Sequence, residues 1–347
     1  MCQQLEFRRS NILTVMEFAH SMVEKQGYMY ILGTQRFPEG NSWKKAGNRI
    51  PVLLEHSLLM LLLPPHQSLA FLLADNGFDV WIANACVTKY SRGHVSLSPH
   101  DKPYWTWTWD ELVAYDFPAT IHYVHDQTGQ KLHYVGHSLG PLIALAAFSR
   151  HQLMDMLRSA ALLCSIAHVS HIASPFTRNA VNSNLAELSD IAKVLESYCK
   201  KPGVNCYLKP SIVDAFLANE PQPTTTKNMI HLSQSVKFDY EFIRDGMIKM
   251  FDYGDKDQNM KYYGQPHPPA YDMTNIPNDF PLFLSYGDAD TISDRKDVHL
   301  LLKSLKGNDG DKLVVLHIDD YAHANFVMGG NAKQVVYDTL MAFLRLQ

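Results

Sequence analysis

Short apolar runs alternate along this chain with segments of helical periodicity, and the alternation predicts a mostly parallel, twisted sheet flanked by helices. The apolar runs at 50–55 and 78–84 predict buried strands, and the segment 67–75 between them has helical spacing. A strand, a helix and a strand in this order are typical of a right-handed parallel crossover. The fold class indicated by the pattern is therefore α/β.

The same rhythm continues in two later blocks. In the first, Asp110 is expected to cap a helix over 111–127, and strands are expected directly before Gly136 and over 160–166. In the second, strands at 281–286 and 312–318 alternate with helices at 294–305 and 332–346. A further strand is expected within 27–37, whereas residues 1–26 predict little.

The pattern changes between residues 167 and 269, where alternating strands disappear and amphipathic helical stretches are broken by prolines. This change predicts an inserted helical cap over the site, and the alternative is additional helices of one domain. The expected division is an N-terminal extension (1–26), a core in two parts (27–166 and 270–347) and a cap or lid (167–269).

The segment Gly136-His137-Ser138-Leu139-Gly140 fits the pattern G-x-S-x-G and lies between an apolar run and a helix rich in Ala and Leu. A serine hydroxyl is a weak nucleophile, so it must be held clear of the sheet beside a base. A sharp strand-to-helix turn does this, and it aims the N–H groups of the helix N-terminus at negative charge on the substrate. Ser138 is therefore the candidate nucleophile, and a silent serine in a packing turn is the alternative.

A serine nucleophile needs a histidine base and a carboxylate that orients it, and in α/β-hydrolases they follow in the order acid, then histidine. Of the aspartates after the strand at 281–286, Asp294 is the expected cap of the next helix, and between Asp288 and Asp290 we favour Asp290. The loop after the last strand contains His323, the candidate base. Two other histidines fall inside strand and helix patterns: His317 and His299.

The oxyanion of an acyl-transfer intermediate is met by two backbone N–H groups. One belongs to the residue after the nucleophile, which is Leu139, and the other comes from an earlier strand-end loop. That loop is expected just after the strand at 50–55, and we name Leu58 as its donor.

The composition of the chain mainly argues against certain partners and kinds of site. The chain of 347 residues is 46% hydrophobic, enough for a large core, and its net charge of −4 comes without a basic run, which disfavours nucleic acid as a partner. The 17 histidines are scattered, with no H-E-x-x-H and no paired C-x-x-C, so neither a metal site nor a cofactor is predicted. Five cysteines cannot all pair; Cys199 and Cys206 either bridge or are free thiols.

Three other stretches predict neither a ligand-binding platform nor a membrane-directing segment. Trp105, Trp107 and Trp109 alternate, which favours one side of an extended segment packing on the core over a stacking platform for bases or sugars. The apolar stretch at 53–63 is too short and too polar to span a bilayer, so no transmembrane segment is predicted. The first 23 residues lack the apolar core of a secretory signal.

Together these residues resemble the acid lipase family, the group with gastric and lysosomal acid lipases, and especially its plant members. The similarity extends from about Gly27 to the C-terminus, and the matching segments are 65–71, 77–84, 90–94, 109–112, 133–140 and the loops of Asp290 and His323. It implies an α/β-hydrolase with a helical cap that cleaves esters of long acyl chains, such as triacylglycerols or sterol esters.

The resemblance assigns Ser138, Asp290 and His323 to the catalytic triad, and Leu58 and Leu139 to the oxyanion hole. It also leads us to expect a lipid or hydrophobic ester as substrate and transient lipid-surface contact through the cap. The compartment stays open, because the family suggests a secreted, vacuolar or lysosomal route, whereas this N-terminus suggests a cytoplasmic chain.

The chain departs from the family in the oxyanion loop. The family has His-Gly-Leu-Leu where this chain has His56-Ser57-Leu58-Leu59, and the loop that follows is shorter here. A Cβ in place of a glycine restricts the turn, and loss of one oxyanion donor costs about a hundred-fold or more in rate. Two alternatives to hydrolysis therefore stay open: acyl transfer or another non-hydrolytic reaction on the same scaffold, and a catalytically weakened lipid-binding relative.

Overall fold

The computed structural model describes residues 3–9, 12–22, 28–37, 49–55, 59–61, 63–168, 171, 212, 214, 219, 222–236, 247–308 and 310–347. Its strands are β1 (Gln3–Arg9), β2 (Ile12–Met22), β3 (Tyr30–Phe37), β4 (Pro51–Glu55), β5 (Asp79–Ala83), β6 (Gly93–His94), β7 (Leu132–His137), β8 (Leu157–Leu163), β9 (Leu282–Gly287) and β10 (Leu313–Ile318). Its helices are α1 (Leu69–Asp75), α2 (Trp109–Glu111), α3 (Phe117–Thr128), α4 (Leu139–Phe148), α8 (Thr226–Val236), α9 (Lys256–Tyr263), α10 (Arg295–Ser304), α11 (Asn325–Met328) and α12 (Asp338–Leu346).

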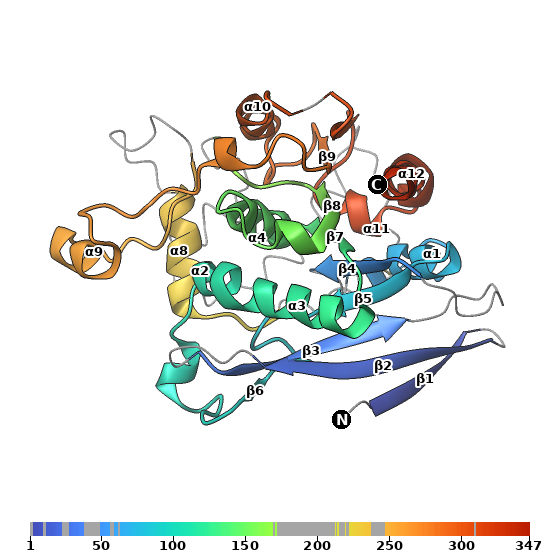
Figure 1. Cartoon of the computed structure of the whole chain (residues 1–347), viewed down its shortest axis with the longest axis horizontal. Coiled ribbons are helices and arrows are strands. Elements are labelled where there is room, and N and C mark those ends of the chain that lie inside the picture. The colour runs from blue at the N-terminus through green and yellow to red at the C-terminus, as the bar shows by residue number, and fades with distance from the viewer. Residues whose placement is uncertain are drawn as a thin grey trace.

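One sheet contains all of these strands, in the order β1-β2-β3-β5-β4-β7-β8-β9-β10, with β6 paired to β3 (Figure 1). Neighbours from β5 to β10 run parallel, whereas β1, β2 and β3 are antiparallel to their neighbours. The chain moves from β4 outward to β5 and later places β7 on the other side of β4, so the strand order reverses between β4 and β7. In open α/β sheets, ligands bind at the carboxyl ends of the strands beside such a reversal.

Alternate residues of the central strands pack into two separate apolar clusters because side chains of a strand point to opposite faces. Leu53 and Tyr134 belong to the cluster under α3 and α4, whereas Val52 and Val135 belong to the cluster under α1 and α12. Every residue of β4 and β7 is buried. Helices thus cover both faces of the sheet (Figure 1).

The predicted strands and helices of the two core parts are present, and the α/β class with its parallel crossover over β4, α1 and β5 is confirmed. The structure adds β1 and β2 within residues 1–26, where the sequence predicted little. These strands extend the sheet beyond β3 by antiparallel pairing. Such pairing depends on neighbouring strands, so local pattern alone gives a weak signal for it.

The segment with alternating tryptophans differs from its prediction. Trp105 ends a 3₁₀ turn and Trp109 begins α2, so the segment is not extended, although Trp107 and Trp109 are buried as expected of packing residues. The helix cap is also different. Thr108, not Asp110, caps α2, and its side chain forms a capping box with Glu111. Asp110 lies inside the first turn, where its carboxylate is available for contacts outside the helix.

Within the range predicted as the cap, the described residues include α8 and α9, and the boundaries at 167 and 269 stay a prediction. Cys199 and Cys206 lie outside the described residues, whereas Cys86 and Cys164 are buried free thiols. Among the helices that the structure describes, none combines the length and the apolar character needed to cross a bilayer.

Candidate active site

Ser138 lies at the sharp turn between β7 and α4, where the sequence analysis expected it. Its backbone has φ 61° and ψ −108°, a conformation that side-chain-bearing residues rarely adopt. Strain of this kind costs about 1–3 kcal/mol and persists only where the surrounding structure imposes it. The turn lifts the hydroxyl above the carboxyl end of β7, at the reversal of strand order.

A continuous hydrogen-bond chain joins three residues that are far apart in the sequence. The Oγ of Ser138 lies 2.8 Å from Nε2 of His323, and Nδ1 of the same imidazole lies 2.9 Å from Oδ2 of Asp290. A carboxylate only accepts hydrogen bonds, so Nδ1 carries the proton and Nε2 is left to accept the serine hydroxyl proton. The three predicted residues are therefore brought together in the geometry that general-base activation of a serine requires.

Asp290 is fixed by its own loop. Its Oδ1 accepts hydrogen bonds from the backbone N–H groups of Ile292 and Ser293, at 2.9 and 2.8 Å, so only Oδ2 faces the imidazole. The side chain of Ser293 donates to the backbone oxygen of Ser165 at 2.7 Å, which ties this loop to the end of β8. The carboxylate is thereby held rigidly behind His323.

The alternative acids and bases make other contacts. Asp288 bonds to Arg295 and His317 near the surface, and Asp294 caps α10 through the N–H of Lys296, as predicted. His299 lies 3.3 Å from the hydroxyl of Tyr286. Each of these side chains therefore has a partner other than Ser138 and His323.

The structure describes only one of the two predicted oxyanion donors. Leu139 is the first residue of α4, so its N–H is one of the first-turn groups that have no partner within the helix. Leu58 lies outside the described residues, and its role stays a prediction. The nearest described residue before it is Glu55, at the end of β4.

The sequence analysis missed two residues that hold the histidine loop. The backbone oxygen of His323 lies 2.9 Å from Nε2 of His137 and 3.4 Å from Sγ of Cys164, so groups at the ends of β7 and β8 both hold this loop. The only sequence signal was the place of His137 inside the G-x-S-x-G motif. Ligand atoms of these three residues lie within 4.8 Å of one another, but both ring nitrogens of His323 are engaged with Ser138 and Asp290. Hydrogen bonds within the site therefore explain why His137, Cys164 and His323 lie close together.

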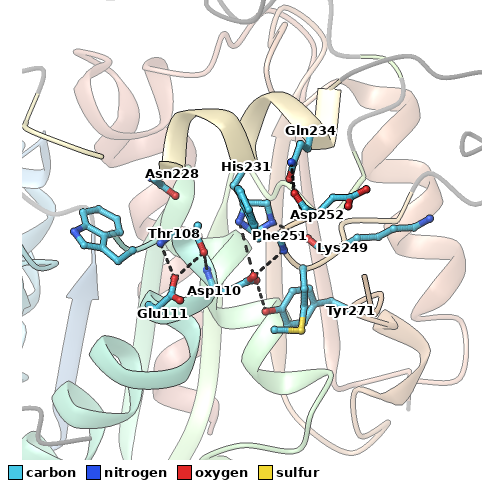
Figure 2. A network of polar contacts seen from close by, with 12 residues as sticks. Thr108, Asp110, Glu111, Asn228, His231, Gln234, Lys249, Phe251, Asp252 and Tyr271 are labelled. Atoms are coloured by element: carbon cyan, nitrogen blue, oxygen red, sulfur yellow. Dashed lines mark hydrogen bonds and ion pairs between the residues drawn. The ribbon is translucent and has the colours of Figure 1, made fainter. Parts of the chain in front are cut away.

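Asp110 anchors the end of the predicted cap to the core (Figure 2). Its carboxylate accepts hydrogen bonds from the N–H of Phe251 at 2.8 Å and from the hydroxyl of Tyr271 at 2.7 Å. His231 of α8 stacks on Trp109 with ring centroids 4.5 Å apart, and it donates from Nε2 to the backbone oxygen of Lys249. The contacts join α2 to α8 and to the strand-like segment that follows it.

Burial shifts both ionisable groups of this anchor toward their neutral forms. It raises the pKa of Asp110 to about 6, against the lowering effect of the bonds from Phe251 and Tyr271. It lowers the pKa of His231 to about 4, so this imidazole is neutral near pH 7. Nδ1 of His231 also lies 3.9 Å from Oδ2 of Asp110, but because this imidazole is neutral, the anchor relies on hydrogen bonds and ring stacking rather than on attraction between two charges.

The fold defines a class, the α/β-hydrolases, and Ser138 lies where enzymes of this class have their nucleophile turn. The family described as alpha/beta hydrolase fold matches residues 50–192. Solved structures of a bacterial membrane phospholipase A and of a monoacylglycerol lipase from Paleococcus ferrophilus superpose with TM-scores of 0.55 and 0.52, over 95% and 91% of this chain and 86% and 99% of theirs. Both are 15% identical to this chain and support the fold alone.

Closer relatives narrow the class. Triacylglycerol lipase 2 and triacylglycerol lipase 1 of Arabidopsis thaliana are 44% and 34% identical over 94% of this chain, covering 84% and 86% of the relatives. Gastric triacylglycerol lipase of Bos taurus is 31% identical over 94% of this chain and 87% of its own length. The chain belongs to this family, the acid lipases, and is a lipase-like carboxylic ester hydrolase.

Proposed function

We propose that the chain hydrolyses carboxylic esters of hydrophobic acyl chains, such as triacylglycerols or sterol esters, with Ser138, His323 and Asp290 as its catalytic triad. The observation that carries this proposal is the continuous chain of hydrogen bonds from Oγ of Ser138 through the imidazole to Oδ2 of Asp290. The relatives named triacylglycerol lipases support the substrate class.

The geometry supports a two-stage reaction. Oγ of Ser138 attacks the ester carbonyl while Nε2 of His323 takes its proton, and Asp290 stabilises the resulting imidazolium. The imidazolium then gives this proton to the leaving alkoxide, which departs as an alcohol and leaves an acyl-serine. Water, deprotonated by the same nitrogen, attacks the acyl-serine, and return of the proton to Oγ releases the carboxylic acid and restores the serine.

The negative oxygen that develops in both stages needs donors already in place. We assign this role to the N–H of Leu139, at the N-terminus of α4, and to the N–H of Leu58 in the segment after Glu55. Ser57 stands where the family has glycine, so this chain carries a Cβ beside the proposed donor. Loss of either donor would lower the rate by about a hundred-fold or more.

We also infer that the predicted cap makes transient contact with a lipid surface. Three large apolar side chains on α8 and α9 are exposed to solvent: Ile230 by 46%, Met260 by 49% and Tyr262 by 56%. Exposed apolar side chains on a protruding helix favour insertion at the boundary of lipid headgroups and acyl chains. Figure 1 shows α9 at the periphery of the molecule, away from the sheet.

The hydrolase proposal is tested with nitrophenyl esters of short, medium and long acyl chains and with emulsified triacylglycerol, comparing the wild type with Ser138→Ala. Wild type is expected to release free acid and Ser138→Ala is not, and a fluorophosphonate probe is expected to label only the wild type. Equal rates for the two proteins would remove Ser138 from the mechanism. Product analysis with an alcohol present separates hydrolysis from acyl transfer, because transfer yields a new ester.

Surface contact is tested separately with a double variant, Met260→Ser with Tyr262→Ser. It should slow the hydrolysis of emulsified triacylglycerol and reduce sedimentation with phospholipid vesicles, while kcat/KM for a soluble ester stays near the wild-type value. Leu346→Ser is the matched control, because Leu346 is 81% exposed and belongs to α12, which lies on the opposite side of the molecule from α9 (Figure 1). Equal losses in both variants would contradict a specific role for α9.

A further inference from the structure

A buried polar pair lies directly beneath the nucleophile turn. The hydroxyl of Tyr134, in β7, donates a hydrogen bond to the Oε2 of Glu55, the last residue of β4. Tyr134 is fully buried and Glu55 is 5% exposed. Glu55 is also in register with Gly136 across the two strands, so Glu55 and Tyr134 bridge β4 and β7 at the place where the strand order of the sheet reverses.

The tyrosine hydroxyl occupies the space left by both glycines of the motif. A Cβ at Gly136 would lie 2.7 Å from the hydroxyl oxygen of Tyr134, and a Cβ at Gly140 would lie 3.0 Å from it. Gly140 also approaches the backbone oxygen of Glu55, where a Cβ would lie 3.4 Å away. The turn that carries Ser138 therefore rests on Tyr134 and Glu55 at its beginning and at its end.

The surroundings of Glu55 favour its neutral form. Among the described residues it makes no ion pair with a lysine or arginine, and the groups that act on it are the Tyr134 hydroxyl and the carboxylate of Asp116. Burial raises the pKa of Glu55 to about 7, the charge of Asp116 adds to this rise, and the hydrogen bond from Tyr134 opposes it. An ionised carboxylate at this place would require hydration that the packed turn excludes.

We propose that Glu55 and Tyr134 are positioning residues, which hold the Ser138 turn in register with the end of β4, and that they do so while Glu55 is protonated. The inference rests on the proposed hydrolase function. Neither residue touches the reacting atoms; they act through the two glycines and through the end of β4. Ionisation of Glu55 then loosens the turn and lowers kcat, because small displacements of a nucleophile or an oxyanion donor slow the reaction severely.

The test is the pH dependence of kcat for a soluble nitrophenyl ester, measured for the wild type, Glu55→Gln and Tyr134→Phe. Glutamine keeps the shape and the acceptor oxygen but does not ionise. Wild-type kcat should fall as the pH rises past neutrality, whereas Glu55→Gln should keep its activity, about fivefold or more above the wild type at pH 8.5 when each is scaled to its own maximum. Any loss of activity at acid pH should be common to both, because Glu55→Gln leaves the Ser138, His323 and Asp290 side chains unchanged.

Tyr134→Phe removes only the donor hydroxyl. It should lower kcat about tenfold with KM changed less than about twofold, since the turn is displaced while the substrate surfaces remain. Asp110→Asn is the matched control, because it removes another buried carboxyl with a raised pKa but lies in the cap anchor. It should leave the alkaline fall of kcat where the wild type has it. Thermal unfolding of each variant checks that it is folded.

Two results would overturn the inference: an alkaline fall in Glu55→Gln that coincides with that of the wild type, or wild-type kcat in folded Tyr134→Phe. Fluorophosphonate labelling of wild-type Ser138 and its ester hydrolysis report on the proposed function itself. If the wild type is labelled and active but the pH profile of Glu55→Gln is unaltered, the positioning role of Glu55 and Tyr134 is refuted and the proposed hydrolase function stands.

Discussion

Replacing Asp290 with asparagine is the most informative single change, because the structure determines how the new side chain must lie. Oδ1 of Asp290 accepts two backbone N–H bonds, from Ile292 and Ser293, at 2.9 and 2.8 Å. An asparagine keeps both bonds by placing its amide oxygen there. Its NH₂ group then faces Nδ1 of His323, where the carboxylate oxygen was.

This orientation of the asparagine forces the imidazole of His323 into its other tautomer. A facing NH₂ donor requires Nδ1 to accept, so the proton moves to Nε2, which then points an N–H at Oγ of Ser138 and cannot remove its proton. The same tautomer error in a serine protease lowers kcat about 10⁴-fold, which corresponds to about 5.5 kcal/mol of transition-state stabilisation. We expect Asp290→Asn to lose about 10³–10⁴-fold in kcat with little change in stability.

The assay is steady-state hydrolysis of a soluble nitrophenyl ester, together with thermal unfolding. Asp288→Asn is the matched control two residues away, because Asp288 bonds Arg295 and His317 and makes no contact with His323 among the described residues. It should keep kcat within about twofold of the wild type. If Asp290→Asn stays within tenfold of the wild type, the tautomer argument and the assignment of the acid are wrong.

Three further predictions concern stability as well as rate. In urea unfolding, the free energy of unfolding of Glu55→Gln should rise relative to that of the wild type by about 3 kcal/mol between pH 4.5 and pH 8. The raised carboxyl pKa of Glu55, about 7, gives the wild type stability that is present at low pH and is lost as the pH rises through this value, whereas glutamine does not ionise. A constant difference between the two proteins would contradict this. Ser138→Gly should abolish hydrolysis yet unfold with up to about 1 kcal/mol more stability, since glycine accepts a φ of 61°, and a less stable variant would argue against strain. Gly287→Ala should cost about 1–3 kcal/mol and reduce kcat, because its Cβ would lie 2.0 Å from the backbone oxygen of Tyr321, two residues before the histidine; wild-type stability and rate would refute it.

Some predictions failed because they judged a side chain by its local position. Asp110 stands where a helix cap is plausible, but Thr108 takes that role, and the carboxylate bonds instead to Phe251 and to Tyr271, 161 residues away. The residues before 27 showed no clear pattern, yet β2 pairs with β3 and β1 pairs with β2. For Asp110 the partners are distant in sequence, so no window of neighbouring residues contains them. The strands β1, β2 and β3 follow one another in the chain, but their pairing gives only a weak signal in a local pattern.

The sequence by itself determined what is local: the alternation of apolar runs with helices, the strand, turn and helix around Ser138, and the cap of α10 by Asp294. These follow from the side-chain periods of strands and helices and from the special turn that a G-x-S-x-G motif forms. Only the tertiary structure decided which loop aspartate faces His323, and that Tyr134 and Glu55 fill the space under the motif's glycines. Assembly of the open sheet brings such groups together, across 185 residues for Ser138 and His323. The partner of a buried polar group is therefore set by the order of the strands rather than by its neighbours in the chain.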